Sequence, residues 1–441
     1  MNVNEDNRFL WSHGALLANT RALLVGILRQ QKEKEITQEH LQELALLAET
    51  QGIPVILSQV VFLRSLKAAT LLTEGKLEEL KCQVIAHNSN LVIFDDEITP
   101  AQQRNLEAFL QVPVIDRIEV ILGVFAMRAK SREAKLQIEL AEIKYQLPRL
   151  KRMWTHLSRQ TGGGGGASGG GYLKGEGEKQ IEIDRRILKR RIEQLEKEIR
   201  QIRLNRETQR GLREKTGVPV VAIVGYTNAG KSALMNLLTS AGVYVEDKLF
   251  ATLDTTTRML TLPNNQDILL IDTVGFIRKL PHLLVAAFRS TLEEAAFADI
   301  ILHVIDASHP MAQEQSQTTL QVLKELHANT DSMIVLFNKI DKLGGDGSLA
   351  NFYKHKFAYP RSLEISAIEN KGIDLLKEEL MDRLKARRVL LHLCIPQKEY
   401  HLVAKGLRDG QVLKKEYDGD HVLLDLDIPQ SQAFHFTPYQ M

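Results

Sequence analysis

Cysteine is scarce in this sequence, and so are long apolar runs. Cys82 and Cys394 lie far apart among 441 residues and match no metal-binding spacing, which predicts ordinary thiols in a reducing compartment. No apolar stretch approaches the roughly 20 residues that a membrane-spanning helix needs. The N-terminus also lacks the basic start of a signal peptide. We therefore expect a cytoplasmic protein without a stable membrane anchor.

Charge is nearly balanced over the chain but unevenly distributed along it. The formal net charge is +2, and the 44% apolar content suits a globular chain of about three domains. Residues 129–217, however, contain 22 lysine and arginine residues against 12 aspartate and glutamate residues. Such a local excess indicates contact with a polyanion such as RNA. A solvated helix face with i,i+4 ion pairs would have a similar composition.

A glycine-bounded turn between an apolar run and a helical pattern is the most specific motif. It follows the run Val-Pro-Val-Val-Ala-Ile-Val and consists of Gly225, Tyr226, Thr227, Asn228, Ala229, Gly230, Lys231 and Ser232. Strand, glycine-rich turn and helix are the context of a phosphate-binding loop, whose amides and helix dipole attract phosphate. We expect Lys231 to contact the β- and γ-phosphates and Ser232 to bind Mg²⁺.

Two later motifs predict that the base is guanine. Asn338, Lys339, Ile340 and Asp341 follow the apolar strand Met333–Phe337, and Ser366, Ala367 and Ile368 follow Leu363–Ile365. The Asp341 carboxylate can accept from the N1–H and the 2-amino group of guanine. Adenine has neither donor and would leave Asp341 unpaired in a closed site. Backbone amides at Ser366 and Ala367 can meet the guanine O6.

The fourth nucleotide-binding motif follows the strand Ile268–Ile271 and consists of Asp272, Thr273, Val274 and Gly275. We expect Asp272 on the metal side and the Gly275 amide as a sensor of the γ-phosphate. Four motifs in the right order predict a GTPase that hydrolyses GTP to GDP and phosphate. Phe276 occupies the position where Ras-like enzymes carry a glutamine that orients water. This favours slow intrinsic hydrolysis with activation by a partner surface, although another side chain of this protein could orient the water.

The remaining pattern predicts an α/β chain of four parts. Residues 1–128 alternate strand-like and helix-like segments, typical of a small α/β domain with a largely parallel sheet. Residues 129–216 predict a basic helical hairpin, with a heptad-like seam from Leu188 to Ile202 and a glycine-rich tip at 162–171. Residues 217–387 form the GTP-binding αβα domain with a mostly parallel sheet, and residues 388–441 a small α+β domain. The tip is either a linker or a segment that contacts RNA, with Arg149, Lys151, Arg152, Arg159, Lys174 and Lys179 available for phosphates.

With these motifs in view, the chain resembles the HflX family of GTPases along almost its whole length. The resemblance is carried by Phe94-Asp95-Asp96-Glu97, by Tyr145–Leu150, by Gly175–Glu178 and by the segment Phe250, Ala251, Thr252, Leu253 and Asp254. It implies that this last segment is switch I and that Thr252 is a second Mg²⁺ ligand. It also implies binding to the large ribosomal subunit and its RNA, with splitting or rescue of stalled ribosomes under stress.

The resemblance bears on two further ligands. The family's N-terminal domain has been linked to adenine nucleotides, and the corresponding segment here is Thr73–Lys76, in which threonine replaces the family's first glycine. In GTPases with a similar loop, the residue equivalent to Asn228 can help to hold K⁺; it can equally well only stabilise the loop. Asp95 and its acidic neighbours lie between a strand and a helix. Acidic residues ahead of a helix usually belong to the loop and complement the helix dipole, so we interpret them as loop residues rather than as a metal site.

We expect a monomer. The alternative functions are a GTPase of ribosome assembly or RNA modification, and an RNA-binding switch protein with incidental turnover.

Overall fold

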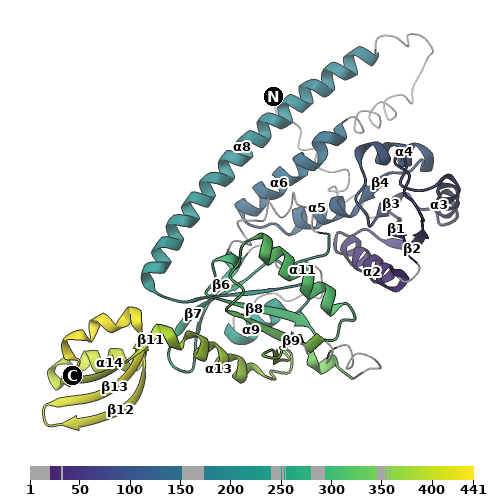
Figure 1. Cartoon of the computed structure of the whole chain (residues 1–441). Helices are drawn as coiled ribbons and strands as arrows, with labels where there is room; N and C mark the ends of the chain where they lie inside the picture. Colours follow the sequence, from purple (N-terminus) through teal and green to yellow (C-terminus); the bar gives the residue numbers. More distant parts are fainter. Residues whose placement is uncertain are drawn as a thin grey trace. The chain divides into compact units, whose positions relative to one another are not determined.

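The structure is a computed structural model of the whole chain, and it describes residues 20–30, 33–150, 173–239, 250, 253, 255–279, 294–344, 352, 355–356 and 358–441. The described residues up to Gln201 belong to one compact unit, and those from Ile202 onward make up most of a second (Figure 1). None of the helices in these ranges combines the length and the apolar character that crossing a membrane requires.

The first unit contains a four-stranded, wholly parallel sheet. Its strands, in the spatial order β2-β1-β3-β4, are β1 (Ala22–Leu28), β2 (Val55–Phe62), β3 (Leu91–Phe94) and β4 (Val114–Asp116). They are connected by α2 (Lys34–Thr50), α3 (Glu74–Ala86) and α4 (Pro100–Leu110). β3 is buried at all four positions, as expected for a parallel strand covered on both faces. The predicted α/β class is confirmed.

Short polar side chains begin the next helices of this unit. The Thr99 hydroxyl and the Gln102 side chain form a reciprocal capping box at α4. Asp116 caps α5 (Arg117–Arg128), and Ser131 caps α6 (Arg132–Gln146). Because Asp116 is also the last residue of β4, the cap places the start of α5 directly at the end of the sheet.

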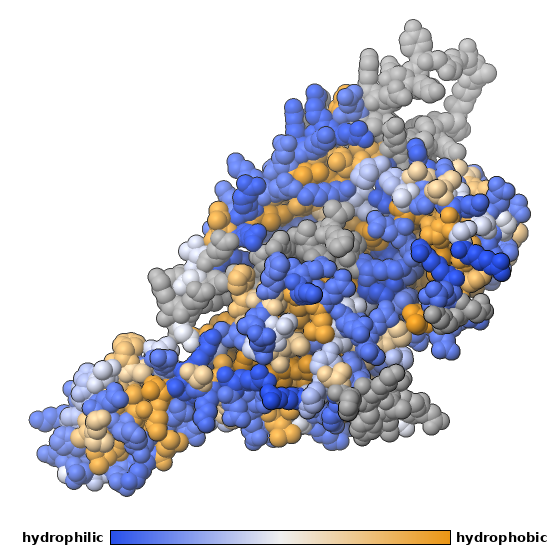
Figure 2. Space-filling view, in the orientation of Figure 1, coloured by the Kyte–Doolittle hydropathy of each residue, from blue (hydrophilic) through white to orange (hydrophobic). Residues whose placement is uncertain are grey.

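α8 (Leu173–Thr216) is a helix of 44 residues that lies alongside α6 (Figure 1). Three ion pairs connect the two helices: Arg191–Glu139 at 2.7 Å, Lys144–Glu196 at 2.7 Å and Arg132–Glu198 at 3.2 Å. Leu195 is fully buried at the middle of the expected seam. Figure 2 shows mainly hydrophilic side chains along α8, interrupted by a band of apolar ones. The helix is therefore amphipathic, as its sequence spacing predicts.

The second unit is built on a six-stranded sheet in the order β10-β9-β8-β5-β7-β6. Its strands are β5 (Val220–Gly225), β6 (Thr256–Thr261), β7 (Asp267–Asp272), β8 (Ile300–Asp306), β9 (Met333–Asn338) and β10 (Leu363–Glu364). Only β6 is antiparallel to its neighbour, which confirms the predicted mostly parallel sheet. The accompanying helices are α9 (Lys231–Thr239), α11 (Ala312–Glu325) and α13 (Ile373–Leu384), with a short 3-10 helix η4 (Ile340–Lys342).

The C-terminal residues form a three-stranded antiparallel sheet in the order β11-β13-β12, packed on one helix. The elements are β11 (Arg388–Pro396), α14 (Tyr400–Asp409), β12 (Gln411–Asp418) and β13 (His421–Pro429). This small domain holds the β6–β7 turn. The Asn265 side-chain amide donates to the carbonyls of Leu407 and Gly410 at 3.2 and 3.0 Å, and Arg388 donates to the carbonyl of Asn264 at 3.3 Å.

Candidate functional site

The phosphate-loop residues lie between β5 and α9, where two glycines allow close backbone approach. A Cβ at Gly225 would lie 2.2 Å from the carbonyl oxygen of Val304, and one at Gly230 would lie 2.2 Å from the Asn338 side-chain nitrogen. Gly230 also has a φ of +95°, which L-residues rarely adopt. Asn228 has a φ of +60° and is exposed at the loop surface. The sequence therefore needs both glycines for the turn itself.

Lys231 begins α9 and points back into the loop. Its side-chain ammonium donates to the carbonyl oxygen of Tyr226 at 2.8 Å, and the residue is only 6% exposed. The pKa of Lys231 is lowered to about 8, because burial and the Lys339 charge lower it by more than the nearby Asp272 carboxylate raises it. Binding of an anion would stabilise a buried ammonium that has few compensating charges.

Ser232 and Asp272 come together from α9 and β7. The Ser232 hydroxyl donates to an Asp272 carboxylate oxygen at 2.7 Å, and Asp272 is fully buried. A hydroxyl and a carboxylate are hard oxygen ligands of the kind that Mg²⁺ prefers. The donor set at this point therefore fits the expected metal.

The segment after β7 runs against the phosphate loop. The Thr273 hydroxyl donates to the Ile223 carbonyl at 2.8 Å. A Cβ at Gly275 would lie 2.9 Å from the Thr227 Cα and 3.1 Å from the Lys231 ammonium. Phe276 is 1% exposed, so its ring packs inside the protein. The structure thus brings Gly275 and Lys231 together.

The residues expected to recognise guanine meet at the ends of β9 and β10. The Ser366 hydroxyl donates to Asp341 at 2.5 Å, which fixes one carboxylate oxygen. The Asn338 side chain donates to the Ala229 carbonyl at 2.9 Å and accepts from the Ala367 amide at 3.1 Å. Asn338 therefore ties the phosphate loop to the Ser366 loop. Ile368 is 75% exposed beside them.

Switch I is the segment of the expected nucleotide site that the structure describes least. Phe250 and Leu253 are buried, whereas Ala251, Thr252 and Asp254 lie outside the described residues. The role of Thr252 as a metal ligand stays a prediction.

One residue near the base site was missed by the sequence analysis. Asp306 ends β8, and its carboxylate accepts from the Lys339 ammonium at 2.8 Å and from the Ser308 hydroxyl at 2.6 Å. Lys339 has a φ of +63°, so its backbone and its side chain are both constrained. The available signal was that β8 and β9 end at the same edge of a parallel sheet.

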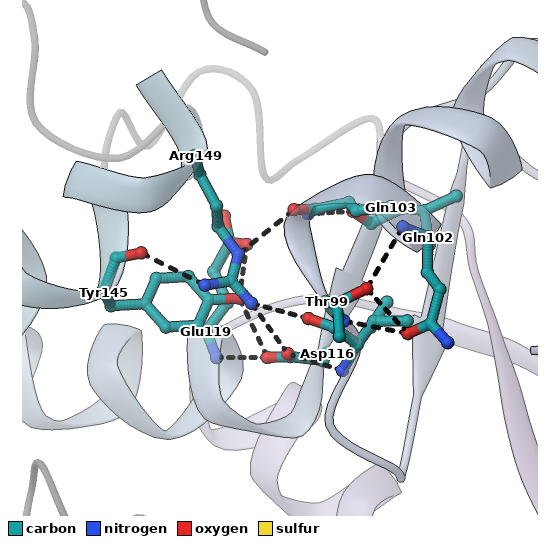
Figure 3. Close-up of polar contacts among 9 residues, drawn as sticks. Thr99, Gln102, Gln103, Asp116, Glu119, Tyr145 and Arg149 are labelled. Atoms are coloured by element: carbon teal, nitrogen blue, oxygen red, sulfur yellow. Dashed lines mark hydrogen bonds and ion pairs between the residues drawn. The ribbon is translucent and has the colours of Figure 1, made fainter. Parts of the chain in front are cut away.

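The N-terminal unit contains a buried polar cluster around Asp116 instead of a surface of phosphate contacts (Figure 3). Arg149 donates to the Ile98 carbonyl at 2.7 Å and to Gln103 at 3.2 Å, and it lies 3.5 Å from Asp116. The Tyr145 hydroxyl donates to Asp116 at 2.9 Å, and the Arg149 guanidinium stacks 3.7 Å from the Tyr145 ring centre. The prediction that Arg149 contacts phosphates is wrong, because protein groups occupy its donors in a site that is 8% exposed.

Burial also changes the acidity of the carboxyl group at the centre of this cluster. It raises the pKa of the Asp116 carboxyl, whereas the Arg149 charge and hydrogen bonds from Ile98, Tyr145 and Glu119 lower it. Asp95 forms a similar buried pair with Arg117 at 2.9 Å, so its carboxylate serves an ion pair within the domain.

The segment Thr73–Lys76 is the one that the family resemblance linked to adenine nucleotides. A Cβ at Gly75 would meet no atom within 4 Å, so packing in this segment does not require glycine.

Comparison with known proteins agrees with this geometry. Family models match residues 38–126 (GTP-binding GTPase N-terminal), 128–213 (GTP-binding GTPase Middle Region) and 220–339 (50S ribosome-binding GTPase). GTPase HflX of Chlamydia pneumoniae is 42% identical over 95% of this chain and 88% of that protein. GTPase HflX of Akkermansia muciniphila is 44% identical over 93% of this chain and 94% of that protein, and that of Escherichia coli is 39% identical over 91% of each.

A solved structure, of a GTP-binding protein from Sulfolobus solfataricus in complex with GDP, is 27% identical, covers 82% of this chain and 98% of that chain, and has a TM-score of 0.41. With two curated relatives above 40% identity over nearly the whole chain, and with the phosphate loop and the guanine-site residues gathered at one edge of a parallel sheet, the chain is a GTP hydrolase that belongs to the HflX GTPase family.

Proposed function

We propose that this GTPase associates with the large ribosomal subunit and couples GTP hydrolysis to the splitting or rescue of stalled ribosomes. The observation that carries the proposal is the match of residues 220–339 to a family described as a 50S ribosome-binding GTPase. The charge of α8 supports it, because this helix contains 14 lysine and arginine residues against nine acidic ones.

The described part of α8 offers that charge to solvent. Arg185, Arg186, Lys189, Arg190, Lys197 and Arg200 are exposed. Glu139 of α6 and Glu196 and Glu198 of α8 are engaged in the ion pairs that join these helices. An exposed basic face of this kind binds phosphate backbones with a strong dependence on salt.

We infer the roles of the nucleotide site from the same geometry. Ser232 would hold Mg²⁺ together with Thr252, with Asp272 beside them, and the metal would supply positive charge to the phosphates. Lys231 would neutralise charge that develops on the β- and γ-phosphates, and the Gly275 amide would contact the γ-phosphate. Asp341 would accept from the two guanine donors. Phe276 cannot orient water, so hydrolysis is slow until the ribosome supplies or positions the missing group.

The ribosome role is tested by co-sedimentation with large subunits, with GDP or a non-hydrolysable GTP analogue, at low and high salt. An Arg186→Ala/Arg190→Ala variant removes two exposed charges one helical turn apart. A Lys324→Ala/Lys398→Ala variant removes two exposed lysines elsewhere and serves as the matched control. The α8 variant should lower the slope of log affinity against log salt by about 2, whereas the control should not. Equal binding of parent and α8 variant would refute α8 as the contact.

GTPase rates separate the proposed function from its alternatives. Strong stimulation by large subunits together with loss of intact ribosomes in gradients supports splitting. Stimulation without splitting favours a role in ribosome assembly or RNA modification, and no stimulation favours an RNA-binding switch. Shortening 162–171 to a tight turn, which should leave GTP binding intact, tests whether the tip, which lies outside the described residues, takes part.

We further propose that Asn228 helps to hold K⁺ near the β–γ bridging oxygen. Its exposed position and left-handed backbone place a carbonyl oxygen at the surface of the phosphate loop. Hydrolysis in K⁺ should exceed hydrolysis in Na⁺ at equal ionic strength, and Asn228→Ala should remove the difference. Identical rates in the two salts would refute the idea.

A further inference from the structure

The side chain of Tyr226 connects the phosphate loop to the segment after β7. Its ring is 6% exposed, and its hydroxyl oxygen accepts a hydrogen bond from the Arg278 backbone amide at 2.7 Å. Arg278 is 8% exposed, so this amide has little access to water. A buried backbone N–H that loses its partner is costly, which gives the hydroxyl control over the conformation of residues 276–278.

Two backbone hydrogen bonds act beside the Tyr226 hydroxyl. The Thr227 amide donates to the Phe276 carbonyl at 2.8 Å, and the Phe276 amide donates to the Gly225 carbonyl at 3.1 Å. Tyr226 and Phe276 thereby form a parallel bridge that continues the pairing of β5 with β7. Together these three hydrogen bonds hold the segment to the end of β5 and to the phosphate loop, and among the three the Tyr226 hydroxyl makes the side-chain contact that mutation can remove.

The register of these contacts explains where Gly275 lies. Ile223 pairs with Asp272, and the next pairing joins Tyr226 with Phe276, so the segment after β7 has one residue more than the loop opposite it. An extra residue between two pairings must bulge out of the ladder. The bulge brings Gly275 towards the loop, where an added Cβ would be 3.1 Å from the Lys231 ammonium. The Tyr226 tether lies immediately beyond this bulge and closes it.

We propose that Tyr226 is a positioning residue of the GTPase site: its hydroxyl holds Arg278 so that the Gly275 amide stays beside Lys231, ready for the γ-phosphate. Tyr226 itself does not contact nucleotide through its side chain. The tether matters for GTP and not for GDP, because only GTP has the phosphate that the Gly275 amide would contact. The inference rests on the nucleotide roles proposed above and is independent of the ribosome role.

The test replaces one oxygen atom. Tyr226→Phe keeps the buried ring and the backbone carbonyl that accepts from Lys231, and removes the hydroxyl that accepts from the Arg278 amide. Tyr359→Phe is the matched control, because its hydroxyl contacts the Ser316 hydroxyl at 3.3 Å in the same domain, away from this segment. Affinities for GDP and for a non-hydrolysable GTP analogue are measured on the same preparation. Their ratio does not depend on the fraction of protein that is folded.

Loss of one hydrogen bond should weaken the GTP analogue about three- to tenfold in Tyr226→Phe, with a change in GDP affinity below about twofold. Hydrogen exchange of the amides at 275–279 should speed up in this variant and not in Tyr359→Phe. Equal losses for GTP analogue and GDP, or no loss at all, would show that the tyrosine is only a structural contact. A Lys231→Ala variant that binds both nucleotides like the parent would instead refute the nucleotide site itself.

Discussion

Acid should destabilise the GTPase domain through one histidine in the middle of its sheet. His303 lies on β8, is 1% exposed, and has strands on both sides. Burial, which is the largest cause, together with the nearby His355 and Lys231 lowers the pKa of His303 to about 3. The folded domain therefore needs this imidazole neutral, whereas the unfolded chain protonates it near pH 6.5.

The sign and the size follow from linkage. Below pH 6.5 the His303 imidazole binds a proton in the unfolded state but not in the folded state. The free energy of unfolding therefore falls as the pH falls towards 3. The contribution of His303 is fully present above pH 6.5, and about 2 kcal/mol of it is lost at pH 5. For a domain of this size, that loss corresponds to a fall in Tm of about 4–8 °C.

Thermal unfolding between pH 8 and pH 5 checks this expectation. The transition of the GTPase domain is identified as the one that GDP shifts upward. His303→Met removes the titrating group with a side chain of similar size, and its transition should vary less with pH by about 2 kcal/mol. The control is His327→Asn, an exposed position with a φ of +55° that asparagine tolerates. If His303→Met and the parent lost the same stability at pH 5, the reasoning would be wrong.

Three further substitutions test other parts of the molecule. Arg149→Ala leaves the fully buried Asp116 without its cation and should cost about 3–5 kcal/mol in the unfolding transition that GDP does not shift; adding Asp116→Ala should restore part of the loss. Arg388→Ala removes bonds to Asp427 at 2.7 and 2.9 Å, so hydrogen exchange in 388–441 should rise while GDP affinity stays constant. Asp341→Asn should weaken GTP about 100-fold and favour xanthine nucleotides, measured by competition binding; unchanged GTP affinity would contradict the assigned role.

The nucleotide motifs could be predicted from sequence because their signal is local. The phosphate loop needs glycine at Gly225 and Gly230 wherever the turn occurs, and the strand and helix beside it are visible as short patterns. The parallel order of the strands then brings Asn338 and Ser366 to the same edge without further information. The sheet class followed from the same kind of signal.

Side-chain partners between distant segments could not be predicted in this way. Arg149 stands in a basic stretch, and only the fold shows that Asp116 and Gln103 take its donors. The Tyr226 hydroxyl has its partner 52 residues away, at a backbone amide that carries no signal of its own in the sequence. A charge pattern predicts binding residues only where their side chains are exposed to solvent. The prediction fails where tertiary packing buries them.

The strand β7 shows how the small C-terminal domain is connected to the nucleotide site. β7 is hydrogen-bonded to β5 on one side and to β6 on the other, so its residues cannot move independently of the sheet. One end carries Asp272, which accepts from Ser232, and the turn before the other end carries Asn265, which the C-terminal domain holds through Leu407 and Gly410. The metal side of the site and the C-terminal domain are thus attached to the same rigid element. We therefore expect movement that depends on GTP in the segment beyond Asp272, which the Tyr226 hydroxyl contacts at Arg278.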